Sequence, residues 1–193
     1  MTPADRPLLQ RDAIVDAARA LIVAGGLEAL SLRRLARGMG VTAPALYAHV
    51  RDKQDLLRAV VDIEIEALAA SFEKFKDLDP VDRIRAHSRA YVAYARENPE
   101  LFRVMLLVPP AGLAGGVPLP ATTTAFAEAV RAVDEAIATG AIKSDDALLV
   151  AMTLWSGAHG VASLLQLGFD LPRELEDAMI DEITDRILAG YRT

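Results

Sequence analysis

Residues 31–56 read SLRRLARGMGVTAPALYAHVRDKQDL, and this stretch constrains the fold more than any other part of the chain. Ser31 is a good N-cap for a short helix over LRRLARG. GMGV is then a tight turn, in which Gly38 or Gly40 can take a positive φ. Thr42 can cap a second short helix over about 43–50, and Pro44 falls in its first turn, where its missing N–H costs little. Two short helices joined by such a turn have the spacing of a helix-turn-helix.

Helical periodicity continues along nearly all of the remaining chain. Ala and Leu dominate the composition, while β-branched and aromatic residues are few, and this balance favours helices. We find no convincing strand and no internal repeat. The apolar spacing predicts further helices over about 9–24, 53–75, 80–97, 99–107, 121–140, 145–167 and 172–190.

The predicted fold is therefore all-α, with about nine helices in two parts. Residues 1–52 are expected to form an N-terminal three-helix head, and residues 53–193 a larger helical body. Segment 108–120 contains four prolines and three glycines and is the only long loop-like stretch. Its pattern is compatible with an entrance flap and also with a disordered connection.

Charge is distributed unevenly between these two parts. The whole chain has a net charge of −6, but residues 1–53 hold eight Lys/Arg against five Asp/Glu, a net of +3. The remaining residues hold 13 basic and 22 acidic side chains, a net of −9. Such an asymmetry indicates an anion-facing head on an acidic body. The alternative is a chance fluctuation among solvated charges.

In a helix-turn-helix the second helix enters the major groove and the first crosses the backbone. The side chains at the start of the second predicted helix are small, so the helix can approach base edges closely: Ala43, Pro44 and Ala45. Hydrogen-bond donors for phosphate follow: Tyr47, His49 and Lys53, the last at a helix N-terminus whose dipole also attracts anions. The outer face of the preceding helix adds Arg33, Arg34 and Arg37. We therefore expect this head to bind double-stranded DNA.

Residues 17–60 also strongly resemble the DNA-binding head of the TetR family of bacterial repressors. The matching pieces are Gly25, Ser31, Leu35-Ala36, Gly40-Val41, Leu46-Tyr47, His49, Lys53 and Leu56. The resemblance implies that phosphates are held by Tyr47, His49, Lys53 and either Ser31 or Arg33, and that bases are met by Thr42, Ala43 and Ala45. The chain departs from the family pattern at Val50, where Phe is usual, and at Pro44.

Two head residues have alternative roles. Tyr47 can close the small core with its ring, and we expect a packed ring with the hydroxyl at phosphate. His49 can serve as a surface or capping residue instead of a DNA contact. With only Thr42 and alanines at the helix tip, apolar contact with thymine methyls and DNA shape are expected to carry much of the sequence specificity.

Several classes of function lack support in the sequence. Cysteine is absent and the three histidines show no metal-binding spacing, so neither a metal nor a cofactor is expected. His87 and Ser88 are adjacent on one helix and diverge by about 100° around its axis, so they cannot form a catalytic dyad. No apolar run of about 18 residues and no secretory signal are found, so we expect no membrane association and a cytoplasmic location.

The most individual segment of the body is MTLWSGAHGVASLLQLG, residues 152–168. Together with NPELFRVML (98–106) it resembles a C-terminal subgroup of the TetR family, the WHG type. A regulator of this kind senses a small molecule, and the candidate pocket residues are Tyr91, Tyr94, Phe102, Met105, Phe126, Met152, Trp155 and His159. Each of these is also compatible with plain core, and His159 with a core or dimer contact. Any ligand is expected to be largely apolar, with one or two polar groups.

A two-fold dimer is expected because one short helix reads too few base pairs alone. Small residues let helices approach closely, so helices 145–167 and 172–190 are the predicted interface. Its residues are Gly157, Gly160, Ser163, Leu164, Leu167, Met179, Ile180, Ile183 and Ile187. The alternative is that this apolar face is buried inside the monomer.

The sequence thus predicts a non-enzymatic, homodimeric transcription regulator, a repressor released from a palindromic operator by a small, largely apolar effector. An all-α small-molecule-binding or scaffold protein without DNA readout is the alternative. Neither the identity of the ligand nor the operator follows from the residues, and the residues do not exclude activation instead of repression.

Overall fold

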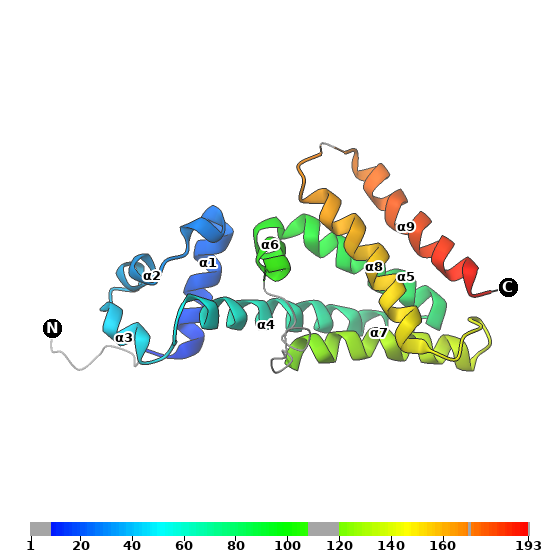
Figure 1. The fold of residues 1–193 in the computed structure, drawn as a ribbon, viewed down its shortest axis with the longest axis horizontal. Coiled ribbons are helices and arrows are strands. Elements are labelled where there is room, and N and C mark those ends of the chain that lie inside the picture. Colours follow the sequence, from blue (N-terminus) through cyan, green and yellow to red (C-terminus); the bar gives the residue numbers. More distant parts are fainter. Residues whose placement is uncertain (1–8, 108–119, 170, 193) are drawn as a thin grey trace.

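The computed structural model describes residues 9–107, 120–169 and 171–192, and within these ranges it contains nine α-helices, one 3₁₀ turn and no strand (Figure 1). The all-α prediction is confirmed. The helices are α1 (Arg11–Ala29), α2 (Leu32–Gly38), α3 (Ala43–Tyr47), α4 (Lys53–Phe72), α5 (Pro80–Glu97), α6 (Pro99–Leu107), α7 (Pro120–Ala138), α8 (Ala147–Leu165) and α9 (Arg173–Gly190). The loop predicted over 108–120 lies outside the described residues, apart from Pro120 at the start of α7.

Most helix ends agree with the expected ones to within a few residues, and two differ in an informative way. The helix α3 ends at Tyr47 instead of continuing to Val50, and a turn over Ala48 and His49 follows, in which the N–H of His49 donates to the carbonyl of Leu46 at 2.9 Å. The long helix α4 ends at Phe72, and a 3₁₀ turn over Glu73–Phe75 follows it.

The end of α1 shows how two glycines shape the head. Gly25 and Gly26 have non-helical backbone angles inside α1, and Gly26 has a φ of +70°. The regular helix therefore stops at this pair, as predicted, although a last turn runs on to Ala29. A Cβ on Gly26 would lie only 2.8 Å from Oε2 of Glu100 on α6. The positive φ favours a glycine here, whereas the flexible Glu100 carboxylate could move away from a Cβ.

The head is built on a small core that continues into the body. Ile14 on α1, Leu35 on α2 and Leu46 on α3 are buried against one another, and the same cluster contains Val60 of α4 and Leu101 of α6. The domain boundary expected at residue 52 therefore crosses a continuous hydrophobic core. Because α1 packs against both α4 and α6, the orientation of the head depends on these two helices.

An ion pair holds the start of α1 against the start of α4. The Arg11 guanidinium donates to both carboxylate oxygens of Asp55, at 3.1 and 3.2 Å, and to the carbonyl of His49 at 2.6 Å. The hydrogen bonds from Arg11, with a further one from the backbone of Arg51, lower the pKa of Asp55 to about 2. This contact links α1 to the start of α4 and to the residues that follow α3.

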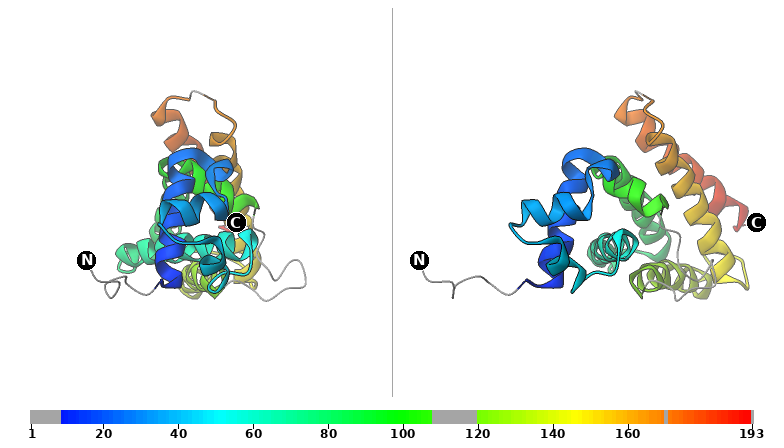
Figure 2. Two further views of the ribbon diagram at one scale, coloured as in Figure 1. Left: turned by 90° about the vertical axis from the view of Figure 1, so that its left-hand side faces the viewer. Right: turned by 60° about the vertical axis from the view of Figure 1, so that its left-hand side comes forward.

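The body is a bundle around α5. In it α4 packs against α7, α5 against α7 and α8, and α9 against α8 and α5. Figures 1 and 2 show α8 and α9 side by side at the end of the molecule opposite to α2 and α3. Three arginines of α5 form ion pairs with α9: Arg85 with Asp185 at 2.8 Å, Arg89 with Asp181 at 2.9 Å, and Arg96 with both Asp177 at 2.9 Å and Glu176 at 3.2 Å.

A buried carboxylate joins head and body. Glu64 on α4 is only 2% exposed. It accepts hydrogen bonds from the guanidinium of Arg19 on α1 and, at 2.7 Å, from the hydroxyl of Tyr94 on α5. Burial and the neighbouring Glu64 carboxylate raise the pKa of Tyr94 above its ordinary value, so its hydroxyl stays a donor. Buried charges are tolerated when they are paired and hydrogen-bonded in this way.

Removing one donor from this carboxylate should destabilise the fold. We expect Tyr94→Phe to lower the free energy of unfolding by about 1–3 kcal/mol, because Glu64 then stays buried with a hydrogen bond missing. Urea denaturation measures the change. Tyr191→Phe, which removes the same atom from a tyrosine at the C-terminal end of the body, is the matched control. Equal losses in the two variants would contradict the role assigned to Glu64.

Candidate nucleic-acid interface and internal cavity

The two short helices of the head have the capped geometry that the sequence predicts. The hydroxyl of Ser31 accepts from the backbone N–H of Arg34 at 3.2 Å, and that of Thr42 accepts from the N–H of Ala45 at 3.4 Å. Between the helices Gly40 takes a φ of +65°. Caps of this kind each stabilise a helix terminus by about 1 kcal/mol. They fix α2 and α3 although both helices are too short to be stable alone.

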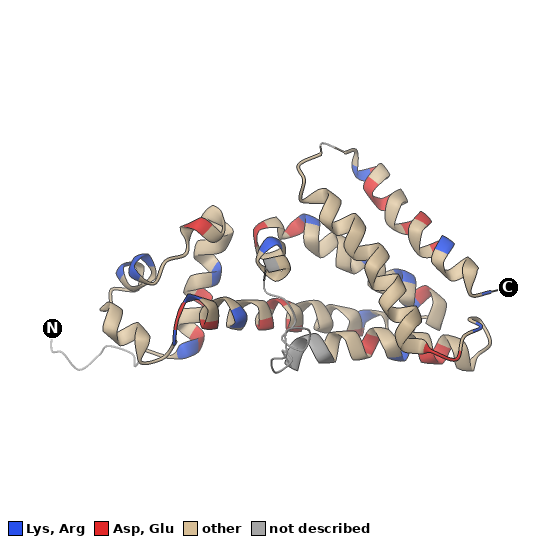
Figure 3. Ribbon diagram, viewed as in Figure 1, with Lys and Arg blue, Asp and Glu red and all other residues tan. Residues whose placement is uncertain are grey.

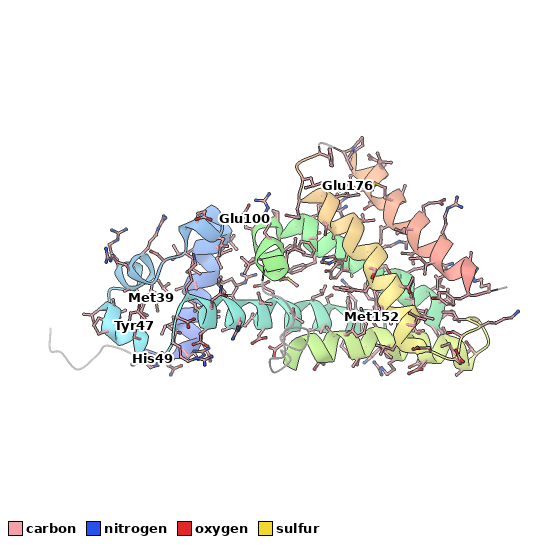
Figure 4. The ribbon with its side chains drawn as sticks, viewed as in Figure 1. Met39, Tyr47, His49, Glu100, Met152 and Glu176 are labelled. Atoms are coloured by element: carbon pink, nitrogen blue, oxygen red, sulfur yellow. The ribbon has the colours of Figure 1, made fainter. Side chains whose placement is uncertain are left out.

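None of the ten residues expected at DNA is buried. Six are exposed: Ser31, Arg33, Arg34, Thr42, Pro44 and Tyr47. Four are half-buried: Ala43, Ala45, His49 and Lys53. Figure 4 shows Tyr47 and His49 at the head end of the molecule, far from Met152 in the body.

One expectation about this surface needs correction. The ring of Tyr47 does not close the small core, because the side chain is 54% exposed. Leu46 and Val50, which are 0% and 2% exposed, already fill the core beneath α3. The whole tyrosine side chain is therefore available at the surface.

Lys53 and Arg11 show contacts that sequence reasoning missed. The ammonium of Lys53 donates to the carbonyl of Leu27 at 3.4 Å, so it spans the gap between the start of α4 and the end of α1. Arg11 holds the His49 carbonyl and Asp55, as described above. No local pattern signals either contact, since each joins residues more than 25 positions apart.

The arginines of α2 form a cationic surface beside α3 (Figure 3). Arg33, Arg34 and Arg37 are exposed, and within the described part of the chain they take part in no salt bridge. By contrast, arginines of the body such as Arg85, Arg89 and Arg96 are paired with carboxylates. The positive charge of α2 is therefore available to an anion, whereas Arg11 and Arg19 of the head and many arginines of the body are paired with carboxylates.

The body contains a cavity of about 500 Å³ between α4, α5, α6, α7 and α8, and it is partly open to solvent, since Met152 and Trp155 on its wall are 41% and 37% exposed. Seven of the eight residues predicted for a pocket lie on its wall: Tyr91, Phe102, Met105, Phe126, Met152, Trp155 and His159. Tyr94 does not, because its hydroxyl points to Glu64 instead, and this assignment is corrected. Apolar residues of α4 and α7 that the sequence did not single out complete the wall, among them Leu68, Phe72 and Val133.

Polar groups on the cavity wall are few. The Tyr91 hydroxyl lies 2.8 Å from Nδ1 of His159, and burial raises the pKa of Tyr91 to about 12. Burial also lowers the pKa of His159. His87 and Ser88, which cannot act as a dyad, both line the cavity. Burial lowers the pKa of His87 to about 4, so both histidines are uncharged at neutral pH.

The predicted dimer residues of α8 and α9 divide into two groups. Gly157 is buried, and a Cβ there would meet the side chains of Ile183 and Ile187 of the same chain at 3.0–3.4 Å. Ile180 is 2% exposed. The small residue Gly157 thus serves the packing of α8 on α9 within one chain, and it and Ile180 are corrected as interface residues. The exposed and half-buried ones are Gly160, Ser163, Leu164, Leu167, Met179, Ile183 and Ile187.

The helix α8 is also long and apolar enough to cross a membrane, by length and composition alone. The expectation that no such stretch exists was wrong for Ala147–Leu165. Its buried residues, which include Val150, Leu154 and Val161, pack against α5, α7 and α9. A core helix passes the same test, and this packing accounts for the buried 39% of the helix, while Leu148, Leu149 and Leu164 are exposed.

Two family models match the chain in agreement with this geometry. Residues 14–60 match "Bacterial regulatory proteins, tetR family", and residues 84–188 match "Tetracyclin repressor-like, C-terminal domain". Neither description specifies the WHG-type subgroup, so that resemblance stays a prediction. Both describe regulators and not enzymes.

Individual relatives support the same assignment. An uncharacterized HTH-type transcriptional regulator of Mycobacterium tuberculosis, Rv0681, is 26% identical over 94% of this chain and 81% of its own length. The tetracycline repressor protein class D of Escherichia coli is 31% identical over 51% of this chain, which spans only 40% of that relative. A solved structure of a protein of unknown function from Rhodococcus sp. RHA1 superimposes with a TM-score of 0.81, at 28% identity and with full coverage of both chains.

The head and body models together cover most of the described helices, and the body model alone covers more than half of the sequence. The chain belongs to the TetR family of DNA-binding transcriptional regulators.

Proposed function

We propose that this protein is a homodimeric repressor that binds a palindromic operator through α2 and α3 and leaves it when a small molecule occupies the body cavity. The observation that carries the proposal is the joint presence of an exposed, unpaired cationic surface on α2 beside α3 and a cavity of about 500 Å³ in the same chain. Membership of the TetR family and the similarity to the tetracycline repressor protein class D support the proposal. Because a regulator of this family must reach DNA, we place its action in the cytoplasm.

The side chains at the tip of α3 determine how DNA is read. The oxygen of Thr42 is engaged in capping, although its hydroxyl proton can still reach a base or a phosphate. Ala43 and Ala45 offer only methyl groups, which suit the methyl groups of thymine. Phosphate contacts fall to Tyr47, His49, Lys53 and the arginines of α2. We therefore assign affinity chiefly to the phosphates, and specificity to apolar contacts and DNA shape.

The dimer is proposed to form through the outer surface of α8 and α9. Leu164 and Leu167 are 39% and 68% exposed, and Leu175 at the start of α9 is 47% exposed. Exposed apolar side chains gathered on two neighbouring helices are typical of a protein–protein interface. A two-fold axis through this end of the molecule places two heads on one operator.

Ligand control requires a path from the cavity to the head. Both α4 and α6 contribute to the cavity wall, and both pack against α1. A ligand shifts the heads only if it binds more tightly to the arrangement that does not fit DNA. The shared helices provide a physical means for that difference.

A mobility-shift experiment tests this function. The protein should retard the DNA upstream of its own gene at moderate salt and with nonspecific competitor, and a panel of apolar compounds should include one that reverses the shift. A folded dimer that retards no such fragment would favour the alternative, a small-molecule-binding protein without DNA readout.

The salt dependence of binding tests the phosphate contacts. The logarithm of the binding constant should fall with the logarithm of salt concentration by about 0.9 per phosphate neutralised. Lys53→Ala should weaken binding to all sequences alike and reduce this slope by about 1, whereas changes at Thr42 or Ala45 should alter the preference among operators. Fluorescence anisotropy with labelled duplexes measures both. A flat salt response of specific binding would rule out this interface.

The oligomeric state tests the outer surface of α8 and α9. Light scattering at micromolar concentration should give the mass of two 20.7 kDa chains for the wild type and of one for Leu167→Glu, because a buried unpaired carboxylate opposes association. Val23→Glu is the control, since Val23 is also an exposed apolar residue, 55%, but lies on α1. A monomeric wild type, or loss of the dimer in both variants, would count against this interface.

A further inference from the structure

The wall of the body cavity lacks charged side chains. Twenty residues line it, and among these described residues there is no Lys, Arg, Asp or Glu. A ligand with a carboxylate, phosphate or ammonium group would lose its hydration here without gaining a partner of opposite charge. Such a loss opposes binding strongly, even after the protein has relaxed. The cavity therefore selects for uncharged molecules.

One end of the cavity holds two polar side chains that face each other. The hydroxyl of Tyr91 lies 2.8 Å from Nδ1 of His159. The ring of His159 also packs against that of Trp155, with 4.9 Å between the centroids. Tyr91 and His159 therefore already have a hydrogen-bond partner within the chain.

His87, also on the wall, is different. It is 8% exposed, and its ring stacks on that of Phe72 with 4.2 Å between the centroids. Its Nδ1 is buried and has no hydrogen-bond partner within the described part of the chain. The neighbouring Ser88 hydroxyl, in contrast, donates to the carbonyl of Ile84 at 3.1 Å. A buried nitrogen without a partner destabilises the protein, so His87 is the polar group of this wall that gains most from a ligand.

The charge state of His87 fits the same conclusion. Burial lowers its pKa to about 4, and Arg83 on its own helix and Arg131 on α7 act in the same direction, while Glu128 on α7 opposes them. The imidazole is therefore neutral, with one donor and one acceptor nitrogen. A hydroxyl group can both donate and accept, so it pairs with a neutral imidazole in either tautomer.

We propose that the cavity binds an uncharged, largely apolar molecule that carries a hydroxyl group, and that His87 is the side chain that hydrogen-bonds this hydroxyl. The proposal rests on the proposed ligand-sensing function and defines its ligand class: phenols and apolar alcohols, not fatty acids, amines or phosphorylated compounds. Aromatic neighbours such as Phe72, Phe102 and Phe126 suit the apolar part of such a ligand.

Three probes with the same skeleton separate the possibilities: 4-butylphenol, butylbenzene and 4-butylbenzoate. Calorimetry on the full chain at neutral pH gives their dissociation constants. Trp155 is the only tryptophan and lies on the cavity wall, so its fluorescence reports entry into the cavity. We expect the phenol to bind on the order of tenfold more tightly than the hydrocarbon, and the carboxylate to bind at least that much more weakly than the phenol.

Substitution of His87 tests the assignment of the partner. In His87→Leu the advantage of 4-butylphenol over butylbenzene should fall to about onefold, while the affinity for butylbenzene stays within about twofold because an apolar side chain of similar volume replaces the ring. His87→Phe keeps an aromatic ring against Phe72 and serves as the second variant if His87→Leu does not fold. The melting temperature of each variant confirms its fold.

The results that would overturn the proposed ligand class differ from those that would overturn ligand-controlled release of DNA. Tight binding of 4-butylbenzoate, a phenol advantage that survives both His87 variants, or no heat and no change in Trp155 fluorescence with any probe would overturn the inference. The same probes are added to the operator complex. A phenol that binds through His87 without releasing DNA supports the ligand class but contradicts ligand-controlled repression. Release by probes that show no phenol preference supports repression but overturns the role of His87.

Discussion

The rest of the structure depends on one buried carboxylate. Glu64 lies in the middle of α4, the helix that runs from the head into the body, and it is stable there only because donors from both sides reach it. Arg19 comes from the head and Tyr94 from the helix that lines the cavity. If either donor moved away, a buried charge would be left incompletely paired. The hydrogen bonds to Glu64 therefore fix the orientation of the head relative to the body more precisely than apolar packing alone would.

The position of Tyr94 makes this constraint relevant to the cavity. Tyr91, which lies on the cavity wall, is three residues earlier on α5, so the two tyrosines occupy neighbouring turns of the same helix. A displacement of α5 at Tyr91 is transmitted to Tyr94 within a rigid element, and from there to Glu64 and Arg19. The other side of α5 is held by its ion pairs with α9. The helix that senses the cavity is thus anchored both to the head and to the proposed dimer surface.

How far the sequence could predict this arrangement depended on the range of each interaction. The caps at Ser31 and Thr42, the turn at Gly40 and the kink at Gly26 are local, and each was predictable from residues a few positions apart. The aromatic and Met residues of the cavity were found because helical spacing places them on one face. Contacts between distant helices were not predictable. Gly157, for example, was interpreted as a dimer residue, because a small residue indicates close helix packing without indicating which helix is the neighbour.

The net charge of the protein is a second property that the sequence alone does not explain. A protein with a net charge of −6 is not expected to bind DNA if only the total charge is considered. In the structure the acidic face of α9 is engaged by arginines of α5, whereas the arginines of α2 are unpaired within the described residues (Figure 3). Charges that neutralise one another across a helix pair contribute little potential at a distance, while unpaired ones act over about a Debye length of 8–10 Å. The field that meets DNA is therefore set by the end of the molecule that carries α2 and α3, not by the sum over the chain.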